Sequence, residues 1–276
     1  MKHEEMQWQA KDATMLFAQK WEPEDNIKGV ICLVHGLGEH SGRYLHWAEK
    51  LVDAGYAALI SDLRGHGKSG GQRGHTPSFD HYADDVSILL EAADGSYPGK
   101  PVFLYGHSLG GLIVLYYLVQ RRPEITGAVV TGPALHSAVA EQKVKVFLAR
   151  LLGSIAPAGS MPSGLEQEAI SSDSAVVEAY RKDPLVHDRV SFGFGKQSLQ
   201  AIDYVFNNAS RINLPLLIMH GTDDRLAYAS GVKELAELLR GDYTLKLWEG
   251  LYHEIHNEAE QDEVFTDLKK WLDSKL

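Results

Sequence analysis

A serine inside a glycine-bounded pentapeptide is the residue of this sequence best suited to covalent chemistry. Gly106, His107, Ser108, Leu109 and Gly110 form the pattern G-x-S-x-G directly after one apolar run and directly before another. In that context the pattern is typical of a sharp strand-to-helix turn that presents the serine hydroxyl at the edge of a sheet. A serine hydroxyl is a poor nucleophile until a histidine, oriented by an acid, takes its proton. The sequence therefore predicts Ser108 as a nucleophile, and a chance match is the weaker interpretation.

The acid and the base are expected directly after later strands, in the chain order serine, acid, histidine. Asp223 and Asp224 follow one later apolar run, and His253 follows another, with His256 three residues further on. We favour Asp224 as the acid and keep Asp223 as the alternative. We favour His253 as the base because it is the first histidine after its run, and His256 is its competitor. Either aspartate has a simpler interpretation as a loop carboxylate that caps the helix expected to begin near Ala229.

An ester or amide carbonyl under attack develops an oxyanion, which needs two backbone N–H donors. The residue after the nucleophile, Leu109, is expected to supply one of them. The other is expected from Leu37, in the glycine-rich loop that follows an early apolar run. His35, in the same loop, is interpreted as a structural hydrogen-bonding residue rather than a catalyst.

These residues need a sheet to position them. Short unbroken apolar runs favour strands that are covered on both faces of a sheet. Six such strands are predicted, at 29–34, 56–60, 102–105, 128–131, 214–219 and 244–247. Apolar stripes with helical spacing lie between or after them, at 79–93, 109–120 and 264–272. Residues 6–21 are ambiguous and fit one or two antiparallel edge strands. Alternating strands and helices predict an α/β protein with a doubly wound parallel sheet.

The connection between the fourth and fifth predicted strands is far longer than the ordinary two to six residues or so. It shows helical periodicity at 144–152 and again near 198–206. We therefore expect residues 1–133 and 211–276 to form the core in two parts, with 134–210 inserted as a helical cap. Ligands of open α/β sheets bind beyond the carboxyl ends of the strands, so the cap is expected to cover the site.

Composition excludes several other classes of protein. The 276 residues include 27 Lys and Arg against 37 Asp and Glu, a formal charge of −10, which disfavours nucleic-acid binding. The single cysteine, Cys32, leaves no disulfide framework or cysteine-rich zinc site. No histidine cluster has the spacing of a metal site, and no run suits a membrane span or a secretory signal. We expect a cytoplasmic enzyme without metal or cofactor, and make no prediction of oligomeric state.

Three motifs resemble those of the monoacylglycerol lipases, a family of α/β-hydrolases close to the lysophospholipases. They are HGLGEHSGRY at 35–44, DLRGHGKS at 62–69 and GHSLGG at 106–111. The resemblance implies an α/β-hydrolase fold, with a mostly parallel central sheet flanked by helices and an inserted helical cap. It also implies Asp224 and His253 as acid and base. The implied reaction releases fatty acid from a monoacylglycerol through an acyl-enzyme intermediate.

The resemblance further implies four residues that hold the glycerol end of the substrate: Glu39, Arg43, Tyr180 and His256. Glu39 and Arg43 also have the spacing of a helical ion pair, so a purely structural pairing is an equal alternative. The same triad serves a lysophospholipase, a short- or medium-chain carboxylesterase or a thioesterase. Lysophospholipids, simple esters and thioesters therefore remain open as substrates. A non-catalytic binding module on the same fold is the remaining alternative.

A small-molecule lipid ester as substrate implies transient contact with a micelle or bilayer surface. The apolar cap residues Val144, Phe147, Leu148, Leu151 and Leu152 are candidates for that contact. The favoured alternative is that they pack the cap onto the sheet. Because the chain is acidic, any attachment to a membrane is expected to be peripheral and hydrophobic rather than electrostatic.

Overall fold

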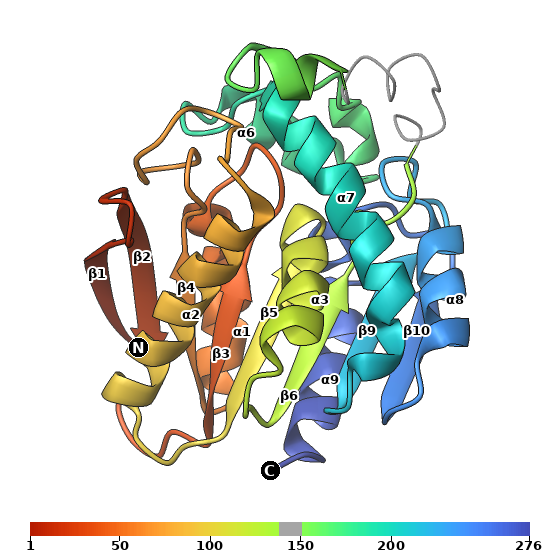
Figure 1. The fold of residues 1–276 in the computed structure, drawn as a ribbon. Helices are drawn as coiled ribbons and strands as arrows, with labels where there is room; N and C mark the ends of the chain where they lie inside the picture. The colour runs from red at the N-terminus through yellow and green to blue at the C-terminus, as the bar shows by residue number, and fades with distance from the viewer. Residues whose placement is uncertain (138–150) are drawn as a thin grey trace.

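The computed structural model describes residues 1–137 and 151–276. In the described part of the chain, an eight-stranded sheet crosses the molecule in the order β1-β2-β4-β3-β5-β6-β9-β10 (Figure 1). The strands are β1 Lys2–Gln9, β2 Met15–Glu22, β3 Gly29–Val34, β4 Tyr56–Ser61, β5 Val102–His107, β6 Gly127–Thr131, β9 Leu216–Gly221 and β10 Tyr243–Trp248. Strand β2 is antiparallel to both of its neighbours, and from β4 to β10 every neighbouring pair is parallel.

The six predicted strands and the mostly parallel sheet are confirmed. The ambiguous segment 6–21 falls in two antiparallel strands, β1 and β2, at one edge of the sheet. Strand β9 begins at Leu216 rather than at residue 214, and the preceding Pro215 has no N–H to donate to a neighbouring strand. Strand β5 continues to His107, so it ends at the residue directly before Ser108.

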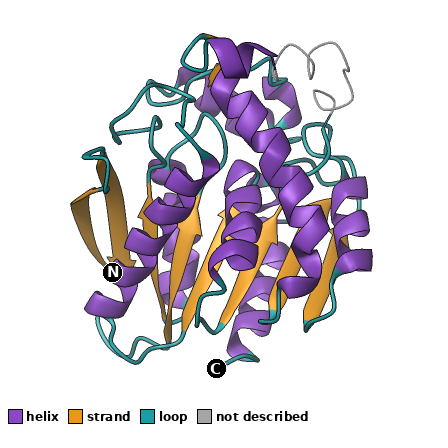
Figure 2. Cartoon of the chain, in the orientation of Figure 1, coloured by secondary structure: helices purple, strands orange, loops and turns teal. Residues whose placement is uncertain are grey.

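Helices cover both faces of the sheet, as Figure 2 shows. Their bounds are α1 Leu45–Asp53, α2 Phe79–Ser96, α3 Leu109–Arg121, α7 Phe192–Asn208, α8 Ala229–Leu238 and α9 Gln261–Asp273. Alternate residues of β3 point to opposite faces: Cys32 packs in a core with α2, α3, α7 and α8, whereas Leu33 packs in a core with α1 and α9. The predicted helices at 79–93, 109–120 and 264–272 are confirmed as α2, α3 and α9.

The segment between β6 and β9 extends beyond the carboxyl ends of the strands (Figure 1). It contains α6 Ser174–Lys182 and a small antiparallel pair, β7 Ser160–Pro162 with β8 Arg189–Ser191. The helix expected near 198–206 is present as part of α7, which also packs along α3. The helix expected at 144–152 lies largely outside the described residues.

Short 3-10 helices complete the described elements: η1 Ser41–Tyr44, η2 Gln167–Ala169, η3 Ala209–Arg211 and η4 Ile255–Asn257. The first and last of them contain two of the predicted site residues, Arg43 and His256. Among the helices of residues 1–137 and 151–276, we find none with the length and apolar character that crossing a bilayer requires.

Candidate active site

Ser108 occupies a tight turn between β5 and α3. Its backbone has φ 55° and ψ −116°, a strained conformation for a residue with a side chain. The flanking glycines are required by close packing. A Cβ atom on Gly110 would lie 2.0 Å from the carbonyl oxygen of Val34, and one on Gly106 would lie 2.4 Å from that of Gly110. The G-x-S-x-G pattern therefore allows β3, β5 and α3 to meet closely enough to present the serine.

The structure joins three of the predicted residues in one chain of hydrogen bonds. Ser108 Oγ lies 2.8 Å from His253 Nε2, and His253 Nδ1 lies 2.7 Å from Asp224 Oδ2. Asp224 follows β9 and His253 follows β10, and these two strands are parallel neighbours. Asp223 is exposed, and its carboxylate accepts a hydrogen bond from the Thr222 hydroxyl. The geometry thus brings Asp224, not Asp223, to the histidine.

The surroundings of this pair push the two pKa values apart. Burial alone would raise the pKa of Asp224, but attraction to His253 and hydrogen bonds from His220 and His253 outweigh burial, and the pKa lies well below its ordinary value. Burial would lower the pKa of His253, but the Asp224 charge and hydrogen bond outweigh it and raise the pKa. An ionised Asp224 therefore accepts a hydrogen bond from the Nδ1–H group of His253, which leaves the Nε2 atom of the neutral ring as an acceptor facing the Ser108 hydroxyl.

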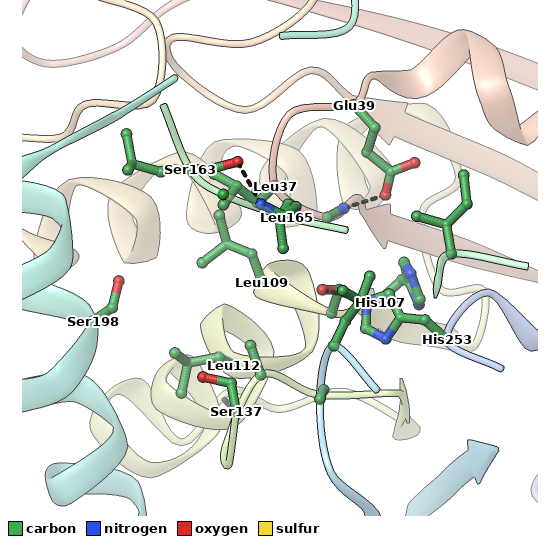
Figure 3. Close-up of a pocket in the computed structure, with 18 of the residues that line it drawn as sticks. Leu37, Glu39, His107, Leu109, Leu112, Ser137, Ser163, Leu165, Ser198 and His253 are labelled. Carbon is green, nitrogen blue, oxygen red and sulfur yellow. Dashed lines mark hydrogen bonds between the residues drawn. The ribbon is translucent and has the colours of Figure 1, made fainter. Parts of the chain in front are cut away.

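Leu37 and Leu109, the predicted oxyanion donors, both line the pocket that contains Ser108 (Figure 3). Leu109 is the first residue of α3, and N–H groups in the first turn of a helix have no partner within that helix. The helix N-terminus also favours negative charge. A developing oxyanion near Ser108 would therefore lie where backbone donors and the helix dipole both stabilise it.

His35 holds the loop that carries Leu37. Its Nε2 atom accepts a hydrogen bond from the backbone N–H of Leu63 at 2.9 Å. The proton of the neutral ring is therefore on Nδ1, which donates to the carbonyl oxygen of Gly36 at 2.8 Å. Burial lowers the pKa of His35, which favours this neutral form. The ring ties the glycine-rich loop to the end of β4, in agreement with the structural interpretation.

A largely apolar cavity of about 360 Å³ opens beside Ser108, within the usual size range for small-molecule sites of roughly 300–1,000 Å³. Core residues and residues from the segment between β6 and β9 share its wall. The apolar side chains of the wall include Leu37, Leu109, Leu112, Leu165, Ile170, Val190, Phe194, Leu199, Ile202 and Leu226. Polar groups at the wall include Glu39, Tyr180 and Glu254. Such a cavity suits an extended apolar group joined to a small polar one.

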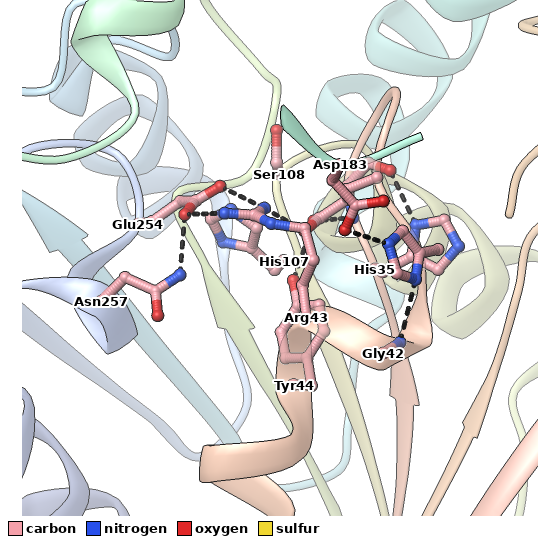
Figure 4. A network of polar contacts seen from close by, with 12 residues as sticks. His35, Gly42, Arg43, Tyr44, His107, Ser108, Asp183, Glu254 and Asn257 are labelled. Carbon is pink, nitrogen blue, oxygen red and sulfur yellow. Dashed lines mark hydrogen bonds and ion pairs between the residues drawn. The ribbon is translucent and has the colours of Figure 1, made fainter. Parts of the chain in front are cut away.

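Arg43 links two buried carboxylates next to this cavity (Figure 4). Its guanidinium donates to Glu39 at 2.6 Å and to both carboxylate oxygens of Glu254 at 2.7 Å. It also lies 4.7 Å from the centre of the Tyr180 ring. Glu39, Tyr180 and Glu254 reach the cavity wall, whereas Arg43 is not among the lining residues. The structural pairing of Glu39 with Arg43 is present, and substrate contact by Arg43 stays a prediction.

His256 is not among the residues that line the cavity, but its ring contacts the lining residue His107. Its ring stacks on Tyr44 at a centroid distance of 5.0 Å and meets the edge of His107 at 4.8 Å. Burial lowers the pKa of His256 to about 3, so the ring is neutral at physiological pH. His253, not His256, contacts Ser108, and substrate contact by His256 stays a prediction.

Two residues of this site were not predicted from the sequence. Glu254 forms the cavity wall and fixes Arg43, and its only sequence signal was its place directly after the predicted base. His220 lies against Asp224, with 3.2 Å between His220 Nε2 and Asp224 Oδ2. Its signal was its place at the end of a predicted strand, four residues before the predicted acid.

Known proteins match this chain over nearly its whole length. Residues 25–260 fit the model of the hydrolase family described as serine aminopeptidase, S33. The monoacylglycerol lipase of Mycolicibacterium smegmatis is 36% identical over 93% of this chain and 92% of its own. An abhydrolase domain-containing protein of Dictyostelium discoideum is 34% identical over 96% of this chain, which spans only 28% of that longer protein.

The solved structures agree with the sequence matches. The crystal structure of the Paleococcus ferrophilus monoacylglycerol lipase superimposes with a TM-score of 0.85, at 35% identity and with 100% of both chains covered. The resemblance seen in the motifs and the expected α/β-hydrolase fold are thereby confirmed. The chain belongs to the serine aminopeptidase S33 family of hydrolases, and within it to the α/β-hydrolases that are similar to monoacylglycerol lipases.

Proposed function

We propose that this protein is a serine ester hydrolase that releases fatty acid from monoacylglycerols. The observation that carries this proposal is the hydrogen-bonded chain from Ser108 through His253 to Asp224 at a largely apolar cavity. The similarity to monoacylglycerol lipases supports the choice of substrate. Lysophospholipids and simple carboxylic esters are the competing substrates for the same groups.

The first half of the reaction forms an ester between the substrate's acyl group and the serine. His253 Nε2 takes the proton of Ser108 as Oγ attacks the ester carbonyl carbon. The backbone N–H groups of Leu37 and Leu109 stabilise the oxyanion, and Asp224 stabilises the imidazolium. The tetrahedral intermediate then collapses, the C–O bond to glycerol breaks, and His253 gives its proton to the departing alkoxide oxygen.

The second half returns the enzyme to its starting state. A water molecule gives a proton to His253 Nε2 as its oxygen attacks the acyl carbonyl carbon. The same backbone donors stabilise the second tetrahedral intermediate. Its collapse releases the fatty acid and returns the proton from His253 to the Ser108 oxygen. No cofactor takes part in either half of this scheme.

The two ends of the substrate suit different parts of the cavity. The apolar wall suits the acyl chain, because burying a chain of methylene groups is favourable. The Glu39 and Glu254 carboxylates and the Tyr180 hydroxyl suit the hydroxyl groups of glycerol, as hydrogen-bond acceptors and a donor. We assign Arg43 and His256 supporting roles at this polar end. The described residues of the 134–210 segment act as the cap, since Leu165, Val190 and Phe194 contribute to the wall.

We further propose that the enzyme works in the cytoplasm and touches lipid surfaces transiently through its cap. Of the predicted contact residues, Val144, Phe147 and Leu148 lie outside the described part of the chain, and Leu152 is half-buried. Leu151 is 45% exposed, and the nearby Ile155 is 72% exposed. Exposed aliphatic side chains on the same segment that supplies part of the cavity wall favour shallow insertion into a bilayer.

Substrate class is tested by comparing hydrolysis of monoacylglycerols, lysophosphatidylcholines and nitrophenyl esters matched in acyl length. We expect the highest kcat/KM for the monoacylglycerol. Ser108→Ala should lower kcat by about 10⁶-fold on every substrate with an unchanged circular dichroism spectrum. A preference for lysophosphatidylcholine would overturn the substrate assignment, and near-normal turnover by the Ser108→Ala variant would overturn the mechanism.

Two neighbouring substitutions test the identity of the acid. Asp224→Asn should lower kcat by about 10⁴-fold, because the amide no longer holds the required tautomer of the base. Asp223→Asn is the matched control, since its side chain is exposed and bonded to Thr222, and should leave kcat within about twofold. Steady-state kinetics on one soluble ester measures both, and the reverse ranking would refute the assignment of Asp224.

The pH dependence tests the base. Only neutral His253 accepts the serine proton. The kcat/KM value is therefore at its maximum above the pKa of His253 and falls as pH drops through that pKa. Because Asp224 raises this pKa above its ordinary value, the acid limb of kcat/KM should have a midpoint above about 6.5. Asp224 stays ionised through this range. A flat profile between about pH 5 and 8 is incompatible with this role.

Vesicle binding tests the lipid contact. Ile155→Ser should weaken co-sedimentation with phosphatidylcholine vesicles by about tenfold, because one large aliphatic side chain no longer inserts. Its hydrolysis of a water-soluble ester should stay unchanged. Leu45→Ser, at a 44% exposed leucine on α1, is the matched control and should bind as the unmodified protein does. Equal binding by all three proteins would remove Ile155 from the contact.

A further inference from the structure

A second histidine, His220, lies close to the same carboxylate oxygen of Asp224 that His253 contacts. His220 is the last residue but one of β9, and its side chain is fully buried. Its Nε2 atom is 2.7 Å from the carbonyl oxygen of Ala227 and 3.2 Å from Asp224 Oδ2. The Ser108–His253–Asp224 chain therefore continues one residue further into the protein.

The partners of His220 fix the position of its proton. A carbonyl oxygen and an ionised carboxylate both accept hydrogen bonds and donate none. The hydrogen therefore lies on Nε2, shared between Ala227 and Asp224. The buried Nδ1 atom has no hydrogen-bond partner among the described residues, which favours the neutral ring, because a proton there would be a buried, unpaired donor.

Together these contacts hold the Asp224 carboxylate from both sides. Oδ1 accepts from the backbone N–H groups of Leu226 at 2.8 Å and Ala227 at 2.9 Å. Oδ2 lies 2.7 Å from His253 and 3.2 Å from His220. Ala227 thus donates to one carboxylate oxygen and accepts from the imidazole that contacts the other. This closed arrangement leaves the carboxylate little freedom to rotate away from His253.

The backbone around Asp224 has supports that do not involve His220. Thr222 N–H donates to the carbonyl oxygen of Trp248 at 2.9 Å, and Asp223 N–H donates to that of Leu251 at 3.0 Å. These bonds join the loop after β9 to the loop after β10. Loss of the His220 side chain should therefore act on the orientation of the carboxylate more than on the path of the two loops.

We propose that His220 is a positioning residue that holds the Asp224 carboxylate, ionised and correctly oriented, against His253. The inference rests on the proposed function, in which Asp224 is the acid. His220 does not contact Ser108 and is not among the residues that line the cavity, so it acts through Asp224 alone. Its loss should lower kcat and leave KM nearly unchanged.

Two variants of similar volume test this role. His220→Phe removes the donor, and kcat should fall about tenfold or more with KM within about twofold, as expected for loss of a hydrogen bond to a buried charge. His220→Gln keeps an amide donor at a similar distance from the backbone and should restore most of kcat. His220→Ala repeats the test if the phenylalanine ring prevents folding. Equal losses in the Gln and Phe variants would overturn the proposal.

A double-mutant cycle separates this inference from the proposed function. If His220 acts through Asp224, then adding His220→Phe to Asp224→Asn should lower kcat no further. Independent, multiplying losses would overturn the role of His220 while leaving Asp224 as the acid. High activity in Asp224→Asn alone would instead overturn the proposed function.

Proton NMR provides a readout that a purely structural role would not move. The strongly deshielded proton expected of the 2.7 Å bond between His253 Nδ1 and Asp224 should persist in His220→Gln and shift or vanish in His220→Phe. His66→Ala is the control, because His66 is equally buried, bonds one backbone carbonyl, and has its ring contacts with His35 and His187 rather than with the triad. It should leave this resonance in place, and an unchanged resonance in His220→Phe would count against the proposal.

Discussion

The hydrogen bond between Asp224 and His253 is the contact on which the proposed chemistry of this protein depends. It connects two loops that are 29 residues apart in the chain, and it exists because β9 and β10 are parallel neighbours that end at the same edge of the sheet. A buried carboxylate needs several donors to stay ionised. Here two backbone N–H groups and two imidazoles supply them, so the cost of burial is offset where a charge is needed.

Ser108 is positioned by a second constraint, the close approach of β3, β5 and α3. Strand β5 is central in the sheet, with β3 and β6 on either side, and the strained serine is held between the strand and the buried helix α3. Nearby, Arg43 carries a positive charge between two buried carboxylates. Removing one partner of such a cluster leaves the other buried charges unpaired, which is energetically costly. The cluster therefore keeps a fixed shape beside the cavity.

The sequence allowed the sheet and the elbow to be predicted because both leave local signals. Buried parallel strands are unbroken apolar runs, and the elbow requires glycines at fixed positions around Ser108. The nine-residue helix α1 was not predicted, because it is short and lies directly after the glycine-rich motif. The sequence favoured Asp224 but kept Asp223 as an alternative, because the folded backbone decides which of two adjacent loop side chains faces the histidine.

Contacts between distant segments were the least predictable part. Glu254 is paired with Arg43, which lies far away in the sequence, and His220 is paired with Asp224 across the turn after β9. No periodic pattern in the sequence indicates either pair. The residues between β6 and β9 combine short elements and irregular loops, so their pattern predicted an insertion but not which side chains reach the cavity. Arg43 and His256 were expected at the substrate; neither is among the residues that line the cavity, and their contact with substrate stays a prediction.

We propose that Ser108 alone, among the serines of the chain, is activated for nucleophilic attack. The most direct test of this proposal is mass spectrometry of the protein after reaction with a fluorophosphonate, followed by peptide mapping. We expect a single covalent adduct, on the peptide that contains Ser108, and its loss in a His253→Ala variant. An adduct on another serine, or equally rapid labelling without His253, would contradict the proposal.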